Sequence, residues 1–251
     1  MPVLLLTLAL CLAIPNAVQA AGIPDSIAAA VASSGRSAAD RERDERDQPA
    51  ALMAFAGVRP GMTVADIFGG GGYWSELFAL AVGSEGHVDL VNNVGYFYYA
   101  REGLKARFAD GRMESITRHV VESCDLELGQ ARVDLAVIFM SYHDLYYVDP
   151  ASGWPRIDAS GFLEQVHAAI KPGGYLLIVD HAAVAGSGNA SAQDLHRIDE
   201  RYAQADIESH GFELERTWDG YRNPADDLTK PVFDPAVRGK TDRFTHLYRR
   251  P

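Results

Sequence analysis

The sequence predicts an α/β fold: a single domain on a doubly wound, mostly parallel sheet. The chain has 251 residues, of which 47% are hydrophobic and 23% charged, as expected for one globular domain with a sizeable core. From residue 63 onward, short apolar runs alternate with segments of helical periodicity, the pattern of a parallel sheet covered by helices. The first apolar run ends in four consecutive glycines, where open α/β sheets bind their ligands.

The charge balance bears on the possible partners. The 34 acidic residues outnumber the 23 basic ones, which gives a formal net charge of −11. Such a field repels nucleic acid and anionic membrane surfaces, so we expect neither as a partner. The two cysteines are too few for a disulfide framework.

The N-terminal segment predicts export. Residues 1–20 are interpreted as a signal peptide, because residues 2–14 are almost wholly apolar and Val18-Gln19-Ala20 has the small-x-small pattern of a cleavage site. The apolar run is too short to span a bilayer, so we expect no membrane insertion after cleavage. The mature protein is then periplasmic or secreted, with Cys124 as its single cysteine.

Residues 21–48 are expected to form a tether or a first loose helix. Charges alternate in sign over residues 40–47, which is typical of a solvated helical face. The α/β domain is placed at residues 49–251. Pro49 permits a helix start for residues 50–55, and Pro60-Gly61 forms a turn before the first strand.

The remaining elements follow from apolar periodicity and from Gly or Pro at their ends. The run at residues 133–140 is nearly continuous, which is typical of a strand buried on both faces. Strands are predicted at residues 63–68, 87–91, 117–121, 133–140, 175–179, 212–218 and 244–249. Helices are predicted at residues 74–82, 96–109, 158–170 and 191–210.

The glycine turn at residues 69–72 predicts a ligand site. Glycines allow a ligand to approach the backbone closely, and the helix that follows offers its positive N-terminal end. A dinucleotide fingerprint, G-x-G-x-x-G, does not fit, because its last position would be Trp74 or Ser75. Asn92 also replaces the acid that would bind an NAD ribose, which argues against an oxidoreductase.

The segment around these glycines resembles a motif of a known family. It reads Val64-Ala65-Asp66-Ile67-Phe68-Gly69-Gly70-Gly71-Gly72. This resembles motif I of the class I S-adenosylmethionine-dependent methyltransferases, with two apolar residues, an acid, an apolar residue and Gly-x-Gly-x-Gly. Further similar segments follow in order: Gly86-His87-Val88, Val133-Asp134-Leu135 and Lys171-Pro172-Gly173-Gly174.

More specifically, the chain resembles an exported group of predicted methyltransferases. The segments that carry this likeness are His143-Asp144, Asp180-His181, His196-Arg197-Ile198, Asn223-Pro224 and Thr241-Asp242-Arg243-Phe244. The resemblance implies a Rossmann-like methyltransferase fold and transfer of a methyl group from S-adenosylmethionine to an unidentified small molecule by direct displacement. It implies these cofactor-binding residues: Asp66, Phe68, Gly69, Gly70, Gly72, Tyr73, Asn92 and Ser141.

Two of these residues depart from the family pattern. Phe68 occupies the first Gly position of motif I, which closes the loop differently over the methionine part of the cofactor. Asn92 stands where most members carry the acid that binds both ribose hydroxyls. An amide accepts and donates hydrogen bonds but lacks the charge-assisted pairing of a carboxylate. We therefore expect Asn92→Asp to strengthen cofactor binding.

Polar residues that follow two neighbouring strands are the catalytic candidates. His143 and Asp144 come after the strand at 133–140, and Asp180 and His181 after the strand at 175–179. His143 is a candidate general base, because the ordinary pKa of histidine is about 6.5. A divalent metal held by Asp144, Asp180 and His181 is a less favoured alternative, with manganese, zinc or iron preferred over magnesium. The same side chains can instead serve only as loop struts.

Two other functions stay open on the same fold. One is a non-catalytic exported protein that binds a small ligand, and the other is a metal-dependent enzyme that uses the His143, Asp144, Asp180 and His181 cluster. Aromatic residues after the strand at 133–140 are expected near the substrate: Tyr146, Tyr147 and Trp154.

Overall fold

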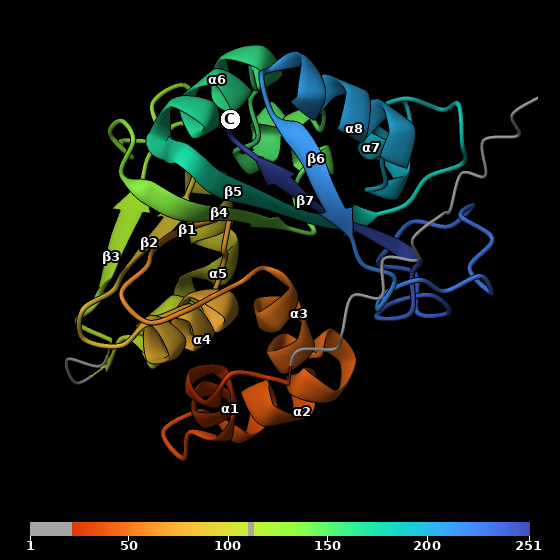
Figure 1. Ribbon diagram of the computed structural model, residues 1–251. Coiled ribbons are helices and arrows are strands. Elements are labelled where there is room, and N and C mark those ends of the chain that lie inside the picture. Colours follow the sequence, from red (N-terminus) through yellow and green to blue (C-terminus); the bar gives the residue numbers. More distant parts are fainter. Residues whose placement is uncertain (1–21, 110–112) are drawn as a thin grey trace, which may run out of the picture.

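The computed structural model describes residues 22–109 and 113–251, so the predicted signal peptide lies outside the described residues. Seven strands form one sheet in the order β3-β2-β1-β4-β5-β7-β6 (Figure 1). The strands are β1 (Thr63–Ile67), β2 (His87–Asn92), β3 (Ile116–Val120), β4 (Val133–Phe139), β5 (Ile170–His181), β6 (Glu213–Thr217) and β7 (Arg243–Arg249). β1 to β5 are parallel, and β7 runs antiparallel to β5 and β6. The predicted doubly wound, mostly parallel sheet is confirmed.

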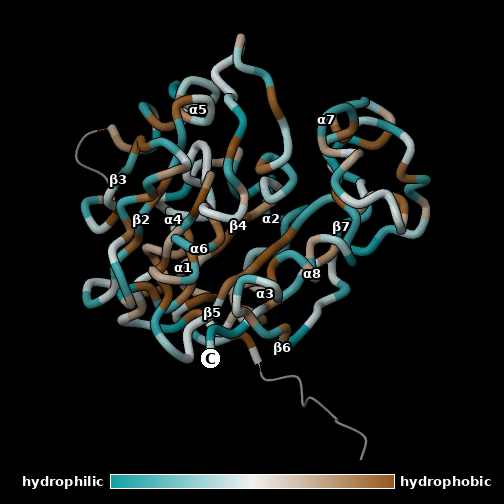
Figure 2. Tube along the Cα trace, turned by 90° about the horizontal axis from the view of Figure 1, so that it is seen from above, coloured by the Kyte–Doolittle hydropathy of each residue, from teal (hydrophilic) through white to brown (hydrophobic). Residues whose placement is uncertain are grey.

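Helices cover both faces of the sheet. They are α1 (Asp25–Ala32), α2 (Ala38–Asp47), α3 (Pro49–Phe55), α4 (Tyr73–Val82), α5 (Val94–Arg107), α6 (Ala159–Ala169), α7 (Ala192–Leu195) and α8 (Glu200–Ser209). Figure 1 shows α1 to α5 on one side of the sheet and α6 and α8 on the other. Each face has its own apolar core, and Figure 2 shows the hydrophobic residues concentrated in these layers, with mostly hydrophilic loops at the rim.

Local sequence explains where the helices next to the site begin and end. α4 follows Gly72 in a left-handed conformation and ends at Gly83, positions that favour glycine. Asn93 caps α5 by accepting a hydrogen bond from the Tyr96 amide, and Asp158 caps α6 in the same way. These caps fix helix starts next to the carboxyl ends of the parallel strands.

The prediction that residues 40–47 form a solvated helical face is confirmed for Arg41, Glu42, Glu45 and Arg46 of α2, which are exposed, but it is wrong for the two aspartates at the ends of this run. Asp40 is 8% exposed and Asp47 is fully buried, because both carboxylates are paired with arginines. Arg107 of α5 binds Asp40 at 2.9 Å, and Arg43 binds Asp47 at 2.6 Å. The alternating charges of α2 therefore make contacts inside the molecule, and α1 packs against α4 through the buried Ile27.

The predicted single helix at residues 191–210 is also wrong. α7 ends at Leu195, His196 has a left-handed backbone with φ of 52°, and α8 begins at Glu200. Asp199 caps α8 by accepting a hydrogen bond from the Arg201 amide. Between the helices the chain becomes extended, and Ile198 forms a parallel bridge with Ala182 at the end of β5.

Over residues 22–109 and 113–251, no helix is both long and apolar enough to cross a membrane.

Candidate active site

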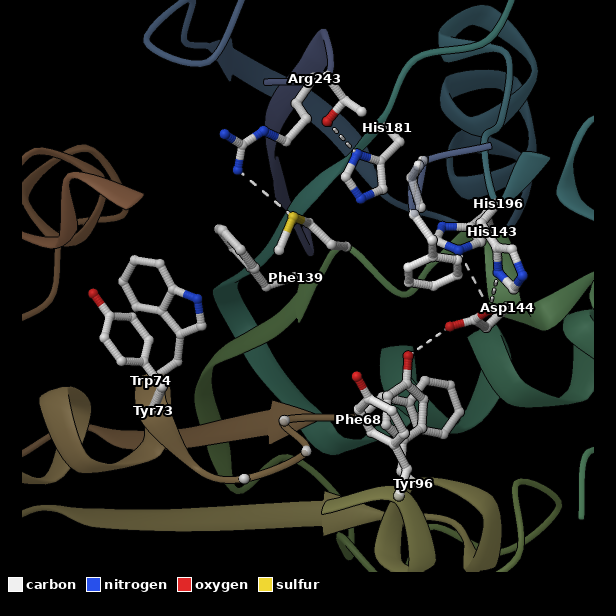
Figure 3. A pocket seen from close by; sticks show the side chains of 18 of the residues that line it. Phe68, Tyr73, Trp74, Tyr96, Phe139, His143, Asp144, His181, His196 and Arg243 are labelled. Atoms are coloured by element: carbon white, nitrogen blue, oxygen red, sulfur yellow. Dashed lines mark hydrogen bonds and ion pairs between the residues drawn. The ribbon is translucent and has the colours of Figure 1, made fainter. Parts of the chain in front are cut away.

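A pocket of about 610 Å³ lies at the carboxyl ends of β1, β4 and β5, within the size range of small-ligand sites. Its walls come from distant parts of the chain: the glycine loop, α2, the starts of α4 and α5, the segment after β4, and residues 232–243. Figure 3 shows aromatic rings on one side of this pocket and three histidines on the other. The location matches the one predicted from the glycine turn.

The four glycines of the loop have different roles. A Cβ at Gly69 would lie 2.4 Å from the Asp66 carboxylate, so only glycine fits there. A Cβ at Gly70 or Gly71 would meet no atom within 4 Å, and both residues line the pocket. Gly72 faces the Arg107 side chain and does not line the pocket. The part of the loop next to open space is therefore Gly70 and Gly71, whereas the cofactor contacts predicted from the sequence included Gly72 and not Gly71.

Asp66 is a buried carboxylate at the base of this loop. Its Oδ2 accepts a hydrogen bond of 2.5 Å from the Ser75 hydroxyl, while its Oδ1 has no partner among the described residues. Burial raises the pKa of Asp66 to about 6, although the Ser75 hydrogen bond acts in the opposite direction. Asp66 lines the pocket, so a bound ligand can supply the missing donor.

Asn92 lies behind the glycine loop and outside the pocket lining. Its Oδ1 accepts a hydrogen bond of 2.9 Å from the Gly70 amide, and its Nδ2 donates one of 3.0 Å to the Gly70 carbonyl. The side chain is 2% exposed, so both of its polar groups serve the loop. Ser141, the other expected cofactor contact after β4, is also buried and absent from the pocket walls, with its Oγ 3.5 Å from the Phe139 carbonyl.

Phe68 and Tyr73 border the loop on two sides. Phe68 has a left-handed backbone with φ of 56°, and its ring stacks on Tyr96 at 5.0 Å between ring centroids. The Tyr73 hydroxyl donates to Asp44 at 2.6 Å, and the Arg43 guanidinium lies 3.9 Å above the Tyr73 ring. Phe68 therefore connects the loop to α5, and Tyr73 connects it to α2.

The predicted histidine and aspartate residues meet at one side of the pocket. His143 begins a short 3₁₀ helix (His143–Leu145) shortly after the end of β4. Its Nδ1 donates to Asp180 at 2.8 Å, its backbone amide donates to the same carboxylate at 2.7 Å, and its Nε2 lies 3.3 Å from Asp144. His143, Asp144 and His181 line the pocket, whereas Asp180 is fully buried behind them.

Burial and neighbouring charges set opposite protonation states for the two predicted histidines. Burial disfavours the charged form of His143, but the charges of Asp180 and Asp144 outweigh it and raise its pKa to about 9. Burial, together with the positive charges of His143 and Arg243, lowers the pKa of His181 well below its ordinary value. At neutral pH, His143 is therefore protonated and His181 is neutral.

His181 is held by a contact from the C-terminal part of the chain. Its Nδ1 is hydrogen-bonded to the Thr241 hydroxyl at 2.7 Å, just before β7. Figure 3 shows the other ring nitrogen of His181 directed into the pocket. Its ring centroid lies 5.9 Å from that of His143, so the two rings flank the same space.

Several pocket residues were not expected from the sequence. His196 enters from the break between α7 and α8, and its Nδ1 lies 3.6 Å from Asp144. Arg43 and Arg46 come from α2, and Arg243 from the start of β7. The pair Asp199-Glu200 is a helix-start signal inside the segment interpreted as one helix, and it would have indicated the break that exposes His196.

The aromatic residues after β4 divide between the pocket and its surroundings. Tyr147 and Trp154 line the pocket, as expected. Tyr146 does not line it, because its hydroxyl donates to Asp206 of α8. Cys124 is the single cysteine among the described residues. It is exposed and does not line the pocket.

Comparisons with known proteins agree with this architecture. No family model matches the chain. The ubiquinone/menaquinone biosynthesis C-methyltransferase UbiE of Hydrogenovibrio crunogenus is 26% identical over 145 residues, which are 57% of this chain and 52% of that protein. The match thus spans about half the length of this curated relative.

Solved structures extend the similarity over most of the chain. A SAM dependent methyltransferase from Aquifex aeolicus aligns with a TM-score of 0.58 and 19% identity, over 84% of this chain and 93% of that one. A putative sarcosine dimethylglycine methyltransferase from Galdieria sulphuraria gives 0.57 and 15%, over 84% and 87%. The chain therefore has the fold of the class I S-adenosylmethionine-dependent methyltransferases, and the resemblance predicted from the sequence is confirmed at the level of the fold.

Proposed function

We propose that the protein transfers a methyl group from S-adenosylmethionine to a small molecule by direct displacement. The observation that carries this proposal is the open space beside Gly70 and Gly71 next to the unpartnered Oδ1 of Asp66, at the end of β1. In sheets of this class, that position is the ligand site. The likeness to methyltransferases of the same fold supports the activity.

The residues of the loop suit the cofactor. The space beside Gly70 and Gly71 is open, Asp66 offers an unpaired acceptor to a cationic amine, and Trp74 and Tyr96 present rings to the same space. When bound, S-adenosylmethionine supplies an electrophilic methyl group on a sulfonium sulfur. The protein then mainly has to align the acceptor with that methyl group, because the reaction is a single displacement.

The histidine side of the pocket would receive the acceptor. Transfer to an oxygen or nitrogen atom releases a proton, and His181 offers a ring nitrogen directed into the pocket to take it. Asp180 orients His143 through two hydrogen bonds, and Asp144 sits between His143 and the rings of the opposite wall. The general-base role expected of His143 thus passes to His181, because His143 is protonated at neutral pH, and Asp180 is a positioning residue behind His143.

The same proposal includes the location of the protein outside the cytoplasm. The apolar residues 2–14 and the cleavage pattern Val18-Gln19-Ala20 support export of the protein to the periplasm or the medium. Cell fractionation followed by N-terminal sequencing checks this. We expect a mature chain that begins at Ala21 or Gly22, and full-length protein in the cytoplasm would contradict it.

Cofactor binding is tested with S-adenosylhomocysteine and a variant at Gly71. This ligand should raise the melting temperature of the wild-type protein, because it binds the folded state. Gly71→Val places its side chain in open space and has no positive φ to strain the backbone, so the variant should fold normally and lose the ligand-induced shift. Gly70→Val is a poorer probe, since its φ of 56° is strained for valine.

The control for this experiment is Cys124→Ser, an exposed change away from the pocket, which should keep the full ligand-induced shift. If the wild-type protein shows no shift at millimolar ligand, the methyltransferase proposal fails. Methyl transfer itself is then measured as S-adenosylhomocysteine formed from S-adenosylmethionine with candidate acceptors.

A non-catalytic, ligand-binding protein on the same fold is the second candidate. The observation that favours it is Asn92, whose two polar groups are occupied by Gly70, so that no acid stands at the end of β2 for a ribose. Binding of S-adenosylhomocysteine without turnover of any acceptor would support this candidate, while product formation would exclude it.

A further inference from the structure

Two histidines and one aspartate form a compact group of side chains at the pocket wall. One ligand atom from each of His143, Asp144 and His196 lies within 4.8 Å of the other two, the only such group of three or more that residues 22–109 and 113–251 provide. The Asp144 carboxylate lies 3.3 Å from His143 Nε2 and 3.6 Å from His196 Nδ1. Figure 3 shows both imidazoles directed toward this carboxylate.

A second layer of hydrogen bonds holds two of these side chains in a metal-binding orientation. Asp180, which is fully buried, binds His143 Nδ1 at 2.8 Å, so Nε2 is the nitrogen turned toward Asp144. The Tyr96 hydroxyl donates to the other Asp144 oxygen at 2.5 Å. A carboxylate behind a ligating imidazole is the usual support of a protein metal site, because it fixes the ring and its tautomer.

The third side chain is placed by a costly backbone conformation. His196 has φ of 52°, a left-handed conformation that is unfavourable for a residue with a Cβ. The next residue, Arg197, is fully buried and anchors the segment through Asp226 at 2.8 Å and the Ala182 carbonyl at 3.0 Å. Strained conformations that the surroundings enforce concentrate at functional sites.

The charges around the group favour a cation, and a metal ion bound there would displace the proton that the two aspartates stabilise on His143 Nε2. Asp144 and Asp180 are both buried, and the nearest arginines have partners elsewhere: Arg197 pairs with Asp226, and Arg243 lies 3.7 Å from Asp47. Asp89 also contacts two histidines, but Arg132 binds its other oxygen at 2.6 Å and already supplies the positive charge.

We propose that His143, Asp144 and His196 bind one divalent transition-metal ion, such as manganese, iron, cobalt or zinc, at the wall of the pocket. Two imidazoles and one carboxylate favour these ions over magnesium and calcium, which prefer oxygen ligands. Three protein ligands leave further positions for water or an acceptor group on the pocket side. The site goes beyond the proposed methyl transfer, and it replaces the ligand set expected from the sequence, because Asp180 supports His143 from behind.

The test measures metal binding directly and does not depend on activity. The protein, treated with a chelator and dialysed, is titrated with Co²⁺ and followed by visible absorption and calorimetry. We expect one equivalent to bind with a ligand-field spectrum, and magnesium at the same concentration to produce no heat. His196→Ala and Asp144→Asn should each weaken Co²⁺ binding at least 100-fold, and Asp180→Asn about 10–100-fold through His143.

The matched control is His119→Ala, which removes one histidine from the group around Asp89 and should leave Co²⁺ binding unchanged. Each variant is first checked by circular dichroism and its melting temperature. Asp144→Asn removes a buried charge beside two histidines, so its effect on binding can be mixed with an effect on folding. His196→Gln changes a partly exposed side chain and is expected to fold normally, so it tests the site independently. Unchanged binding in folded His196 variants, or loss only in His119→Ala, would overturn the proposal.

The outcomes for metal and cofactor are distinguishable. Binding of S-adenosylhomocysteine is measured separately on the metal-free protein, and Gly71→Val should abolish it while Co²⁺ binding persists. A protein that binds Co²⁺ but not S-adenosylhomocysteine keeps the metal site and loses the methyltransferase proposal. A protein that binds S-adenosylhomocysteine but no stoichiometric Co²⁺ loses the metal site alone.

Discussion

Asn92 shows why an amide can stand where a carboxylate is common. The side chain contacts both the amide and the carbonyl of Gly70, so it must donate and accept at once. Asparagine does this, whereas an ionised aspartate only accepts. The residue therefore stabilises the shape of the glycine loop from behind, and it does not reach a ribose in the pocket. The expected gain in cofactor affinity from Asn92→Asp loses its structural basis.

The structure predicts that Asn92→Asp destabilises the protein. The change removes the hydrogen bond to the Gly70 carbonyl and leaves a buried carboxylate oxygen facing that carbonyl. An unsatisfied buried group of this kind costs about 1–3 kcal/mol in the free energy of unfolding. Urea denaturation measures the loss, and calorimetry with S-adenosylhomocysteine should show no gain in affinity.

Asn93→Asp is the matched control for this prediction. Asn93 accepts a hydrogen bond from the Tyr96 amide as the cap of α5, and an aspartate accepts it equally well. Its stability should therefore stay within about 0.5 kcal/mol of the wild-type protein. An Asn92→Asp variant that is as stable as Asn93→Asp and binds the ligand more tightly would restore the ribose interpretation.

At the scale of elements, the segment between α7 and α8 depends on one buried arginine. Arg197 is fully buried, and its guanidinium binds the Asp226 carboxylate and the carbonyls of Lys230 and Ala182. These contacts tie the break between the helices to the end of β5 and to the long loop before β7. The position of His196 in the pocket follows from this anchor.

We predict that Arg197→Met lowers the free energy of unfolding by about 3–5 kcal/mol, because it leaves the Asp226 charge buried and without its partner. Asp226→Asn in the same chain should recover part of the loss, since the uncompensated charge is gone. Arg222→Met is the control: its pair with Glu200 is partly exposed, and its loss should cost at most about 1 kcal/mol. If Arg197→Met and Arg222→Met lowered the free energy of unfolding equally, the role of Arg197 as an anchor would be contradicted.

Sequence periodicity predicted the strands well, because each buried strand is an apolar run that its own residues define. β4, predicted at 133–140, is Val133–Phe139 in the structure. The same reasoning placed His143 and Asp180 together, because the ends of adjacent parallel strands meet at one edge of the sheet. It failed for His196, since the helical pattern of the residues around it hides a break that is fixed by tertiary contacts of Arg197.

Side chains whose partners are distant in the sequence were also missed. Charges that alternate over residues 40–47 are typical of a surface helix, and nothing local indicates that Asp40 pairs with Arg107, 67 positions away. In the same way, Asn92 stands at the motif position of the residue that binds the ribose. Only its contact with Gly70 in three dimensions shows that it supports the glycine loop. Local patterns identify elements, whereas pairings across the fold need the structure.

Arg107 joins three parts of the structure that are distant in the sequence. Its Nε donates to the Gly71 carbonyl at 2.7 Å, and its two terminal nitrogens bind Asp40 of α2 at 2.9 and 3.0 Å. The same guanidinium contacts Glu76 of α4. The glycine loop, the N-terminal helices and α4 are therefore held by one cation, and α2 in turn brings Arg43 and Arg46 to the pocket.

We predict that Arg107→Gln loosens α2 more than the rest of the molecule. Asp40 and Glu76 would face each other across the site of the lost cation, and the free energy of unfolding should fall by about 2–4 kcal/mol. Hydrogen exchange followed by mass spectrometry should show faster exchange in α2 and the glycine loop, with little change in α6 on the opposite face of the sheet.

Arg101→Gln on the same helix is the control for this last prediction. Arg101 and Glu102 are exposed, with 62% and 81% of their side chains accessible, so their ion pair contributes little and exchange in α2 should match the wild-type protein. In the wild-type protein, α1 and α4 contribute side chains to the same hydrophobic core, so we expect the N-terminal helices and the sheet to unfold in a single transition. If exchange in the Arg107 variant rises equally in α2 and α6, the arginine stabilises the fold as a whole and does not specifically fix α2 over the pocket.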